Sequence, residues 1–299
     1  MQSTILIFLD GVGIGKADAN SNPFFKYNFQ TFTKLFDAIP HLGNKTISKN
    51  NRFIFPTDAI MGMPNLPQSG TGQTSIFCGV NASKILGKHF GPYPHSKLLP
   101  IIREENIFKN FLEMKKKVVF VNAYPKIFFD YIKDGSKRMS VTSLSCRYSN
   151  VKLLTKSNLI RGNALSAEID NSRWVQNLKY NIKVVKPETA AKRLLKIASK
   201  NHFTLFEHFQ TDLLGHGRES ETLEERLKVL DRFLLYLFEN LPKDYNLIVC
   251  SDHGNLEDIS IKSHTTNPAL TITAGKDAEQ LSKKISNISQ IRNAILELY

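Results

Sequence analysis

The feature that most constrains the fold of this chain is an apolar run that ends in an acid and an imidazole. Residues 245–250 are mostly apolar, with β-branched Ile248 and Val249 near the end, which predicts a buried strand. Asp252 and His253 follow almost at once. Ligands bind at the carboxyl ends of strands in open α/β sheets, and a carboxylate beside an imidazole suits Zn, Mn or Fe. The pair therefore predicts a metal site, with a capped turn as the alternative.

Further apolar runs alternate with helical patterns along the chain. We expect strands at residues 5–9, 117–123, 202–209, 245–250 and 269–275, and helices at residues 96–111, 187–198, 221–241 and 288–298. Strands that alternate with helices predict an α/β fold, with a mostly parallel sheet sandwiched by helices. Residues 16–60 are polar and predict loops, with their phenylalanines in the core.

Residues 124–186 differ in composition and periodicity from the rest of the chain. They are rich in Ser, Asn and Lys, have weak periodicity, and contain the only tryptophan, Trp174. We expect a small inserted α+β cap here, and a core formed by residues 1–123 and 187–299. The cap holds four arginines that are either solvated surface residues or phosphate contacts: Arg138, Arg147, Arg161 and Arg173.

The net charge of +13 allows a nucleic acid, an anionic membrane surface or an anionic small substrate as partner. The lysines are scattered apart from the run at residues 115–117, and no helix-turn-helix pattern accompanies them. This scatter favours a solvated Lys-rich surface over nucleic-acid binding. No apolar run reaches the ~18 residues that span a bilayer, so no membrane partner is expected.

Three widely spaced cysteines imply no disulfide framework: Cys78, Cys146 and Cys250. The first ten residues are too short for a signal peptide and are interrupted by Asp10, so they predict a first strand. Both observations favour a reducing, cytoplasmic setting. With 299 residues, of which 41% are hydrophobic, the chain has the size of one large domain or a domain with an insert.

Asp10 follows the first strand and opens the segment Asp-Gly-Val-Gly-Ile-Gly at residues 10–15. A dinucleotide-binding fingerprint needs Gly-x-Gly-x-x-Gly, whereas these glycines are spaced Gly-x-Gly-x-Gly. An aspartyl-phosphate phosphatase would carry a second Asp where Val12 stands. A metal ligand at the end of a strand, followed by glycines that permit a tight turn, is the interpretation we prefer.

Ser69 stands where a Pro-rich approach gives way to Ser-Gly-Thr-Gly and an apolar run, which predicts a helix that begins near this residue. Its hydroxyl has two possible uses. It can cap the helix, or it can act as a nucleophile in front of free N–H groups that hold an anionic phosphoryl group. Thr71, two residues on, is a rival nucleophile.

Other potential ligands follow the later strands. Asp212 and His216 are four residues apart, so in a helical turn both would project to one side. Loops at one edge of a sheet can converge, and the resulting set is large enough for two divalent cations: Asp10, Ser69, Asp212, His216, Asp252, His253 and His264. The remaining histidines lack such neighbours and are expected on the surface or in the core.

At this point the chain resembles the alkaline phosphatase superfamily, and within it the branch of cofactor-independent phosphoglycerate mutase and phosphopentomutase. The matching segments appear in the family's order and cover roughly residues 1–123 and 187–299. They are Leu9-Asp10-Gly11, Ser69-Gly70-Thr71-Gly72, Asp212-Leu213-Leu214-Gly215-His216, Ser251-Asp252-His253-Gly254-Asn255 and His264-Thr265-Thr266-Asn267-Pro268.

The resemblance implies an alkaline phosphatase-like core with two cations, Mn or Zn first and Mg as a further option. One cation would be held by Asp212, His216 and His264. The other would be held by Asp10, Asp252 and His253 together with the Ser69 oxygen. Ser69 would then attack the phosphorus of a small phosphorylated substrate and form a phosphoserine.

Two departures from the family affect the expected reaction. The mutases usually carry His where this chain has Gln73, and the expected cap is smaller than the clamping domain of phosphoglycerate mutase. We therefore expect hydrolysis of a phosphate mono- or diester, with a phosphomutase of phosphoglycerate or phosphopentose type as the alternative. A non-catalytic or nucleic-acid-binding protein on this fold is the third hypothesis.

Overall fold

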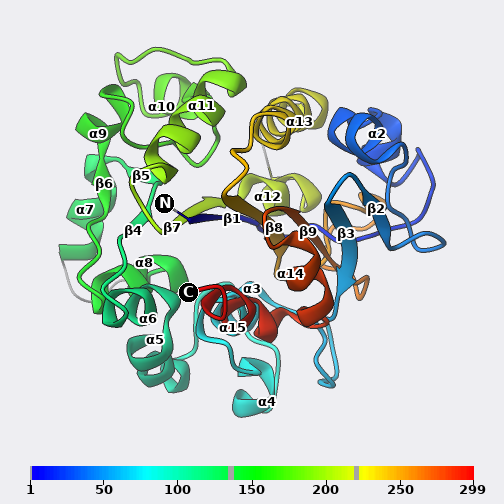
Figure 1. Ribbon diagram of the computed structural model, residues 1–299, viewed down its shortest axis with the longest axis horizontal. Helices are drawn as coiled ribbons and strands as arrows, with labels where there is room; N and C mark the ends of the chain where they lie inside the picture. Colours follow the sequence, from blue (N-terminus) through cyan, green and yellow to red (C-terminus); the bar gives the residue numbers. More distant parts are fainter. Residues whose placement is uncertain (1, 134–137, 219–221) are drawn as a thin grey trace.

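The computed structural model describes residues 2–133, 138–218 and 222–299, and its centre is a seven-stranded sheet with helices on both faces (Figure 1). The strands follow the order β2-β3-β9-β8-β1-β7-β4. Their bounds are β1 (Ser3–Leu9), β2 (Ile47–Lys49), β3 (Arg52–Thr57), β4 (Val118–Phe120), β7 (Phe203–His208), β8 (Tyr245–Ser251) and β9 (Ala269–Gly275). The α/β fold class expected from the sequence is confirmed.

The sheet is mostly but not purely parallel. β8, β1, β7 and β4 are parallel neighbours, whereas β9 runs antiparallel to β8, and β3 and β2 continue the antiparallel edge. The hairpin of β2 and β3 corrects the expectation of loops throughout residues 16–60. Its signal was weak because β3 contains Pro56, which cannot donate to a strand ladder and so argues against a strand.

Alternate side chains of β1 enter two separate cores, as the period of a strand requires. Ile5 and Ile7 face the core under α2 (Gln30–Phe36), α11 (Pro187–Ala198) and α13 (Leu223–Glu239). Leu6 and Phe8 face the opposite core, which is covered by α3 (Ser69–Cys78), α5 (Leu99–Glu105), α6 (Ile107–Glu113), α14 (Ala278–Lys284) and α15 (Ile291–Leu296). A parallel sheet buried on both faces explains why these strands are almost continuously apolar.

Shorter elements complete the layers and correct two predicted helix boundaries. They are α1 (Pro23–Lys26), α4 (Ala82–Leu86), α12 (Gln210–Gly215), and the 3-10 turns η1 (Ser96–Leu98) and η2 (Ile288–Gln290). The single helix expected over residues 96–111 is divided into η1, α5 and α6, because Asn106 adopts an extended conformation and caps α6. The closing helix likewise begins as η2, and residue 221 of the expected helix 221–241 lies outside the described ranges.

The segment expected to form a cap contains α7 (Lys126–Lys133), α8 (Val141–Tyr148), α9 (Lys156–Ile160), α10 (Ser172–Gln176) and a two-stranded parallel sheet of β5 (Ala123–Tyr124) and β6 (Leu154–Thr155). A small core around Trp174, Leu154 and Leu159 holds part of it together. α8 instead packs against α3 and α5 of the main layers. Residues 134–137 of this segment lie outside the described ranges, and its status as a separate domain stays a prediction.

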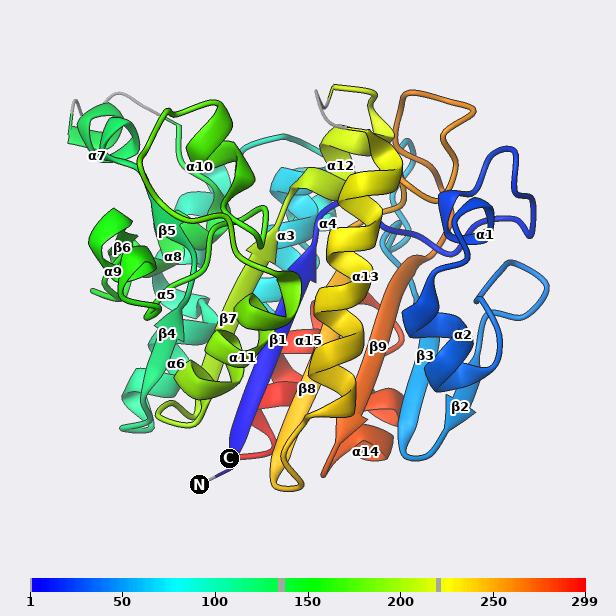
Figure 2. The same ribbon diagram turned by 90° about the horizontal axis from the view of Figure 1, so that it is seen from above.

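Three parallel strands end at the same level, and this alignment creates the site. Leu9 of β1 pairs with both His208 of β7 and Ser251 of β8, so the loops that follow leave one edge of the sheet together. In Figure 2 the arrowhead of β1 points toward the edge where α12 lies. Within the described ranges, no helix combines the length and apolar character needed to cross a bilayer.

Candidate metal and active site

The loops after β1 and β8 bring together Asp10, Asp252 and His253. His253 Nε2 lies 3.4 Å from Asp10 Oδ1 and 3.4 Å from Asp252 Oδ2, and all three side chains are buried. Their ligand atoms all lie within 4.8 Å of one another, which is close enough for one cation to contact all three. The backbone N–H of Gly11 donates to Asp252 Oδ1 at 3.2 Å and fixes one of its oxygens.

A second group lies beside the first and includes Asp212, His216 and His264. Asp212 Oδ1 is 3.4 Å from His264 Nε2, and Asp212 Oδ2 is 3.4 Å from His216 Nε2. Asp212 and His216 occupy one turn of α12, so the expected i, i+4 placement on one side is observed. Asp212, His264 and His253 also fall within 4.8 Å of one another, so His253 borders both groups.

The burial and chemistry of these Asp and His side chains fit the binding of divalent cations. Asp252 Oδ2 is fully buried and has no hydrogen-bond partner among the described residues. Buried carboxylate oxygens are normally bonded, paired with a charge or coordinated to a metal. Carboxylate oxygens and imidazole nitrogens are ligands shared by Zn, Mn and Fe. The arrangement therefore matches a metal centre better than a structural hydrogen-bond network.

Backbone carbonyls orient the histidine rings. Nδ1 of His216 lies 2.9 Å from the carbonyl oxygen of Lys262, and Nδ1 of His264 lies 2.7 Å from that of Pro67. A ring nitrogen that donates to a carbonyl leaves the other nitrogen with its lone pair free for a cation. In both residues the nitrogen that would bind a cation is the Nε2 that faces Asp212.

The hydroxyl of Ser69 enters this cluster from the first residue of α3. Ser69 Oγ lies 3.1 Å from His253 Nε2 and 3.5 Å from Asp10 Oδ1. The hydroxyl of Thr71 has other partners: it lies 3.1 Å from the carbonyl oxygen of Gln68, to which it donates, and accepts from the N–H of Phe90. Of the two rival nucleophiles, Ser69 is the one beside the metal-ligand candidates.

Glycine permits the close approach of α3 to the site. A Cβ on Gly72 would lie 2.8 Å from Asp252 Cβ, and a Cβ on Gly70 would lie 2.3 Å from the carbonyl oxygen of Tyr93. Larger residues at either position would push the helix away from the β8 loop or from the loop at residues 90–93. The two glycines therefore let Ser69 reach His253.

Burial and mutual repulsion shift the protonation of the first group. Burial raises the pKa of Asp252 to about 7, and burial together with the Asp252 carboxylate holds the pKa of Asp10 well above its usual range. Burial lowers the pKa of His253 to about 3. The neutral forms are therefore favoured when no cation is bound, and a cation would reverse the shift for both carboxyl groups.

In the second group, the pKa of Asp212 is lowered and that of His264 is raised, so both charged forms are favoured. Burial opposes ionisation of Asp212, but hydrogen bonds from His264 and Asn255 with the charge of nearby histidines outweigh it and lower the pKa to about 2. Burial likewise disfavours the charged form of His264, yet its hydrogen bond with Asp212 raises the pKa above the ordinary value. This carboxylate is thus ionised and ready to bind a cation across the physiological range.

Two buried residues that support the site were not anticipated from the sequence. Glu257 accepts hydrogen bonds from the backbone N–H groups of Gly13 and Asn255, both at 2.8 Å, and thereby joins the loops after β1 and β8. Asn255 in turn donates from Nδ2 to Asp212 Oδ1 at 2.7 Å. In the sequence, their position shortly after the Asp252-His253 pair was the feature that could have indicated a role at the site.

A further buried carboxyl group lies beside Asp10 and was also missed. Glu207, near the end of β7, accepts a hydrogen bond from Thr142 of α8 at 2.6 Å, and burial raises its pKa to about 7. An acidic residue inside an otherwise apolar strand was the signal that could have found it. Gln73, the departure from the mutase pattern, donates to Asp10 Oδ2 at 3.3 Å.

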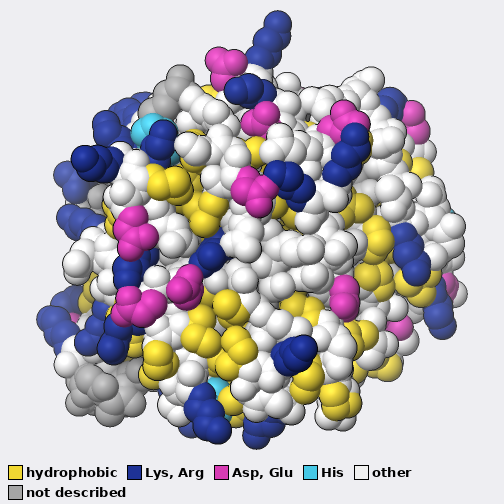
Figure 3. Space-filling view, turned by 60° about the horizontal axis from the view of Figure 1, so that its bottom comes forward, with side chains coloured by type: hydrophobic (Ala, Val, Ile, Leu, Met, Phe, Trp, Pro, Cys, Tyr) yellow, Lys and Arg dark blue, Asp and Glu magenta, His cyan; other side chains and the backbone are white. Residues whose placement is uncertain are grey.

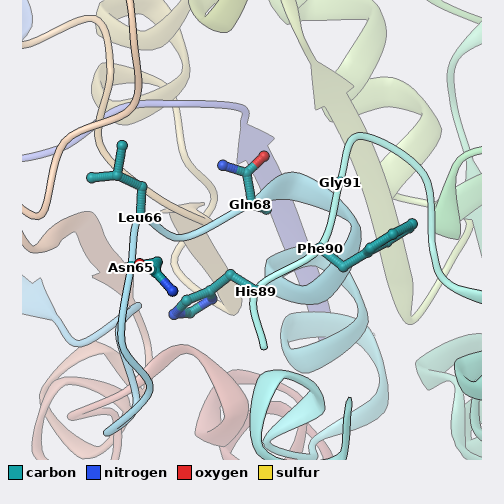
Figure 4. A pocket seen from close by; sticks show the side chains of 6 residues that line it. All are labelled: Asn65, Leu66, Gln68, His89, Phe90 and Gly91. Atoms are coloured by element: carbon teal, nitrogen blue, oxygen red, sulfur yellow. The ribbon is translucent and has the colours of Figure 1, made fainter. Parts of the chain in front are cut away.

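A cavity of about 480 Å³ adjoins the turn that carries Ser69 (Figure 4). Asn65, Leu66 and Gln68 line it from the approach to α3, and His89, Phe90 and Gly91 line it from the facing loop. Its lining combines amide groups, an imidazole and an aromatic ring. Small-molecule sites have this size and this mixture of apolar and polar lining.

Comparisons with known proteins agree with this fold. The sequence profile of the Metalloenzyme superfamily matches residues 2–298. A stretch of 135 residues is 27% identical to 2,3-bisphosphoglycerate-independent phosphoglycerate mutase of Mycoplasmopsis pulmonis, and it covers 41% of this chain and 27% of the mutase. The match thus spans only about a quarter of the mutase's length.

Two solved structures share the architecture. A magnesium-bound variant of alkaline phosphatase from the Antarctic bacterium TAB5 aligns with a TM-score of 0.56 and 15% identity, over 99% of this chain and 97% of that chain. PH0037 from Pyrococcus horikoshii aligns with a TM-score of 0.53 and 14% identity, over 91% and 85% of the two chains. Fold and clustered ligands thus define an α/β metalloenzyme with an alkaline phosphatase-like fold. The chain belongs to the Metalloenzyme superfamily.

Proposed function

We propose that this chain is a two-metal phosphoryl-transfer enzyme that uses Ser69 as its nucleophile and hydrolyses a phosphate mono- or diester. The observation that carries the proposal is the 3.1 Å separation between Ser69 Oγ and His253 Nε2, at the start of a helix and inside a cluster of Asp and His. A hydroxyl placed in this way combines a nucleophile, an anion-binding helix terminus and a cation site.

The two groups of ligands divide naturally between two cations. Asp212, His216 and His264 would hold one, while Asp10, Asp252 and His253, with the Ser69 oxygen, would hold the other. The mixture of oxygen and nitrogen donors favours Mn or Zn, with Mg as a further option. Two cations there supply Lewis-acid stabilisation of the charge that develops on the transferring phosphoryl group.

The chain's own residues perform the rest of the reaction. The N-terminus of α3 orients the anionic phosphoryl group in front of Ser69 through its leading N–H groups. The bond between Ser69 Oγ and phosphorus forms as one ester oxygen leaves. Water then cleaves the bond between phosphorus and Ser69 Oγ, which releases phosphate from a monoester or a phosphate monoester from a diester. The organic part of the ester would occupy the cavity of about 480 Å³ lined by Gln68 and Phe90.

A phosphomutase is the alternative, since both reactions share the phosphoserine step. The similarity to a phosphoglycerate mutase supports it, although that match covers 27% of the mutase. A mutase must keep its substrate while excluding water, and the small segment at residues 124–186 offers less cover than a clamping domain. This difference favours hydrolysis.

A non-catalytic or nucleic-acid-binding role is the weaker hypothesis, because Ser69 and the candidate ligands together form a site suited to phosphoryl transfer. We also propose a reducing, cytoplasmic setting. It is supported by Cys78, Cys146 and Cys250, which are buried free thiols in the structure.

The proposal is tested by a screen of phosphate mono- and diesters with added Mn, Zn or Mg, in which free phosphate and isomerised product are both measured. Metal-dependent release of phosphate from an aryl phosphate supports hydrolysis, whereas isomerisation without release supports the mutase alternative. Failure of every ester to react with every metal would overturn the phosphoryl-transfer proposal.

A further inference from the structure

A second cavity lies away from the metal-ligand candidates, in the segment at residues 124–186. It has a volume of about 510 Å³ and is enclosed by α7, α8 and residues 150–153. Its lining is mainly apolar and mainly aliphatic: Phe129, Ile132, Met139, Val151 and Leu153. We call this cavity the α7 groove.

Among the described residues of the lining, three are cations and none carries a carboxylate. Lys133 comes from α7, Arg147 from α8 and Lys152 from the loop that follows α8, and all three are exposed. Lys133 has a carboxylate 3.8 Å away on Asp130, but Asp130 is outside the lining. The α7 groove therefore combines an apolar floor with a positive rim.

The surroundings of the groove strengthen this positive potential. Residues 124–186 hold twelve Lys and Arg against four Asp and Glu, which is +8 of the chain's net charge of +13. Two of those four acids, Glu168 and Asp170, are buried and face inward. Lys and Arg side chains gather along the left edge of the molecule in Figure 3, the side on which Figure 1 places α7 and α9.

α7 makes few buried contacts with the rest of the protein, and the cavity lies between it and α8. None of its residues is buried, and its main anchor is the ring of Phe128, which stacks on Tyr124 with centroids 4.0 Å apart. Ile127 on this helix is 66% exposed. A helix with this much uncovered apolar surface is stabilised when an apolar ligand fills the space between it and α8.

We propose that the α7 groove binds a single-chain anionic amphiphile, such as a long-chain carboxylate or alkyl phosphate. The chain would lie on Ile132, Met139 and Val151, where it loses its contact with water. The anionic head would lie at the rim, where Arg147 and the two lysines give charge-assisted hydrogen bonds. This inference does not depend on the proposed phosphoryl-transfer function.

Two other anionic partners fit the groove less well. Single-stranded nucleic acids bind by stacking bases on aromatic rings, and Phe129 is the only aromatic residue in the lining. A membrane surface binds amphipathic helices through a broad apolar face, whereas α7 has eight residues and the apolar surface is concave. An apolar cavity with three exposed cations in its lining matches one acyl or alkyl chain with an anionic head.

The test is calorimetric titration of the full-length protein with decyl phosphate below its micelle concentration. We expect saturable 1:1 binding, and at least about tenfold weaker binding of decyltrimethylammonium and of butyl phosphate, because each lacks one of the two complementary parts. The double variant Arg147→Glu/Lys152→Glu should bind decyl phosphate at least about tenfold more weakly than the unmodified protein does. The matched double variant Lys97→Glu/Lys200→Glu reverses two exposed charges elsewhere and should bind normally.

Several outcomes would overturn the inference. They are equal binding of the cationic detergent, unchanged affinity in the Arg147→Glu/Lys152→Glu variant, or binding only to phosphatidylglycerol vesicles and not to monomeric decyl phosphate. A Leu153→Trp variant gives an independent readout, because ligand in the groove should shift its fluorescence to the blue. Binding should persist in Ser69→Ala, so failure here is distinguishable from failure of the catalytic proposal.

Discussion

The rings of His253 and His264 stack face to face, with centroids 3.8 Å apart and planes inclined by 21°. Each ring belongs to a different group of ligand candidates, so the stack joins the two groups into one site. Burial keeps His253 neutral, whereas the Asp212 hydrogen bond favours the charged form of His264.

Metal binding should release protons near neutral pH. Asp252 has a folded-state pKa raised to about 7 from an ordinary 3.8, so the metal-free native protein holds a proton that the unfolded chain loses between these values. Its contribution to stability therefore falls as pH rises through that window. A cation that binds Asp252 must displace this proton.

We expect calorimetric titrations of the chelator-stripped protein with Mn or Zn to show release of at least about one proton at pH ~6, decreasing by pH ~8 as Asp252 ionises in the metal-free protein. Buffers of different ionisation enthalpy measure the proton count, and the apparent affinity should rise over the same interval. A proton count of zero at the lower pH would exclude Asp252 as a ligand of the bound metal.

Ser69→Ala should abolish turnover while leaving the fold and the bound metal in place, because it removes the hydroxyl that lies 3.1 Å from His253 Nε2. Thr71→Ala should instead reduce stability by about 1 kcal/mol, since it leaves the partly buried N–H of Phe90 without its acceptor. Steady-state kinetics and urea unfolding separate the two effects. Full activity in the Ser69 variant with loss in the Thr71 variant would exchange the assigned roles.

Glu257→Gln should weaken metal binding without removing a ligand. The carboxylate accepts from four donors, two of them on the backbone, and an amide turns one acceptor into a donor that faces other donors. The expected loss of metal affinity is about 10–100-fold. Metal content after dialysis checks it, and the exposed Glu239→Gln variant is the control. Equal metal retention in both variants would contradict the supporting role.

Arg226→Met should destabilise the contact between α13 and the segment before α10. Arg226 Nη2 lies 2.8 Å from Asp170 Oδ2, and both side chains are buried. Removing one partner of such a pair typically costs about 3–5 kcal/mol, because it leaves the other charge buried.

Replacing both partners, as in Asp170→Leu/Arg226→Met, should recover much of that loss. The control is Arg232→Met, which breaks an exposed ion pair with Glu188 and should cost under ~1 kcal/mol. Chemical denaturation of the four proteins measures the free energies of unfolding. If the Arg226 and Arg232 variants were equally stable, the buried pair would not hold this contact together.

The sequence alone determined the local pattern of this protein. Continuous apolar runs predicted β1, β7, β8 and β9, because a strand buried on both faces is apolar at nearly every position. Helical stripes with period 3.6 predicted α11 and α13. Likewise, residue chemistry singled out Asp10, Asp252 and His253 before any distance was known. Their roles as metal ligands stay predictions, although the structure places them together.

Only the tertiary structure decided which groups meet. The resemblance favoured Ser69 over Thr71, but only the structure shows that the Ser69 hydroxyl points at His253 and that the Thr71 hydroxyl bonds to Gln68. No sequence pattern indicated a partner for Glu207, whereas in the structure Thr142 of α8 donates a hydrogen bond to it. Periodicity specifies how one element is built, whereas strand register and helix packing fix the distances between segments that lie far apart in the chain.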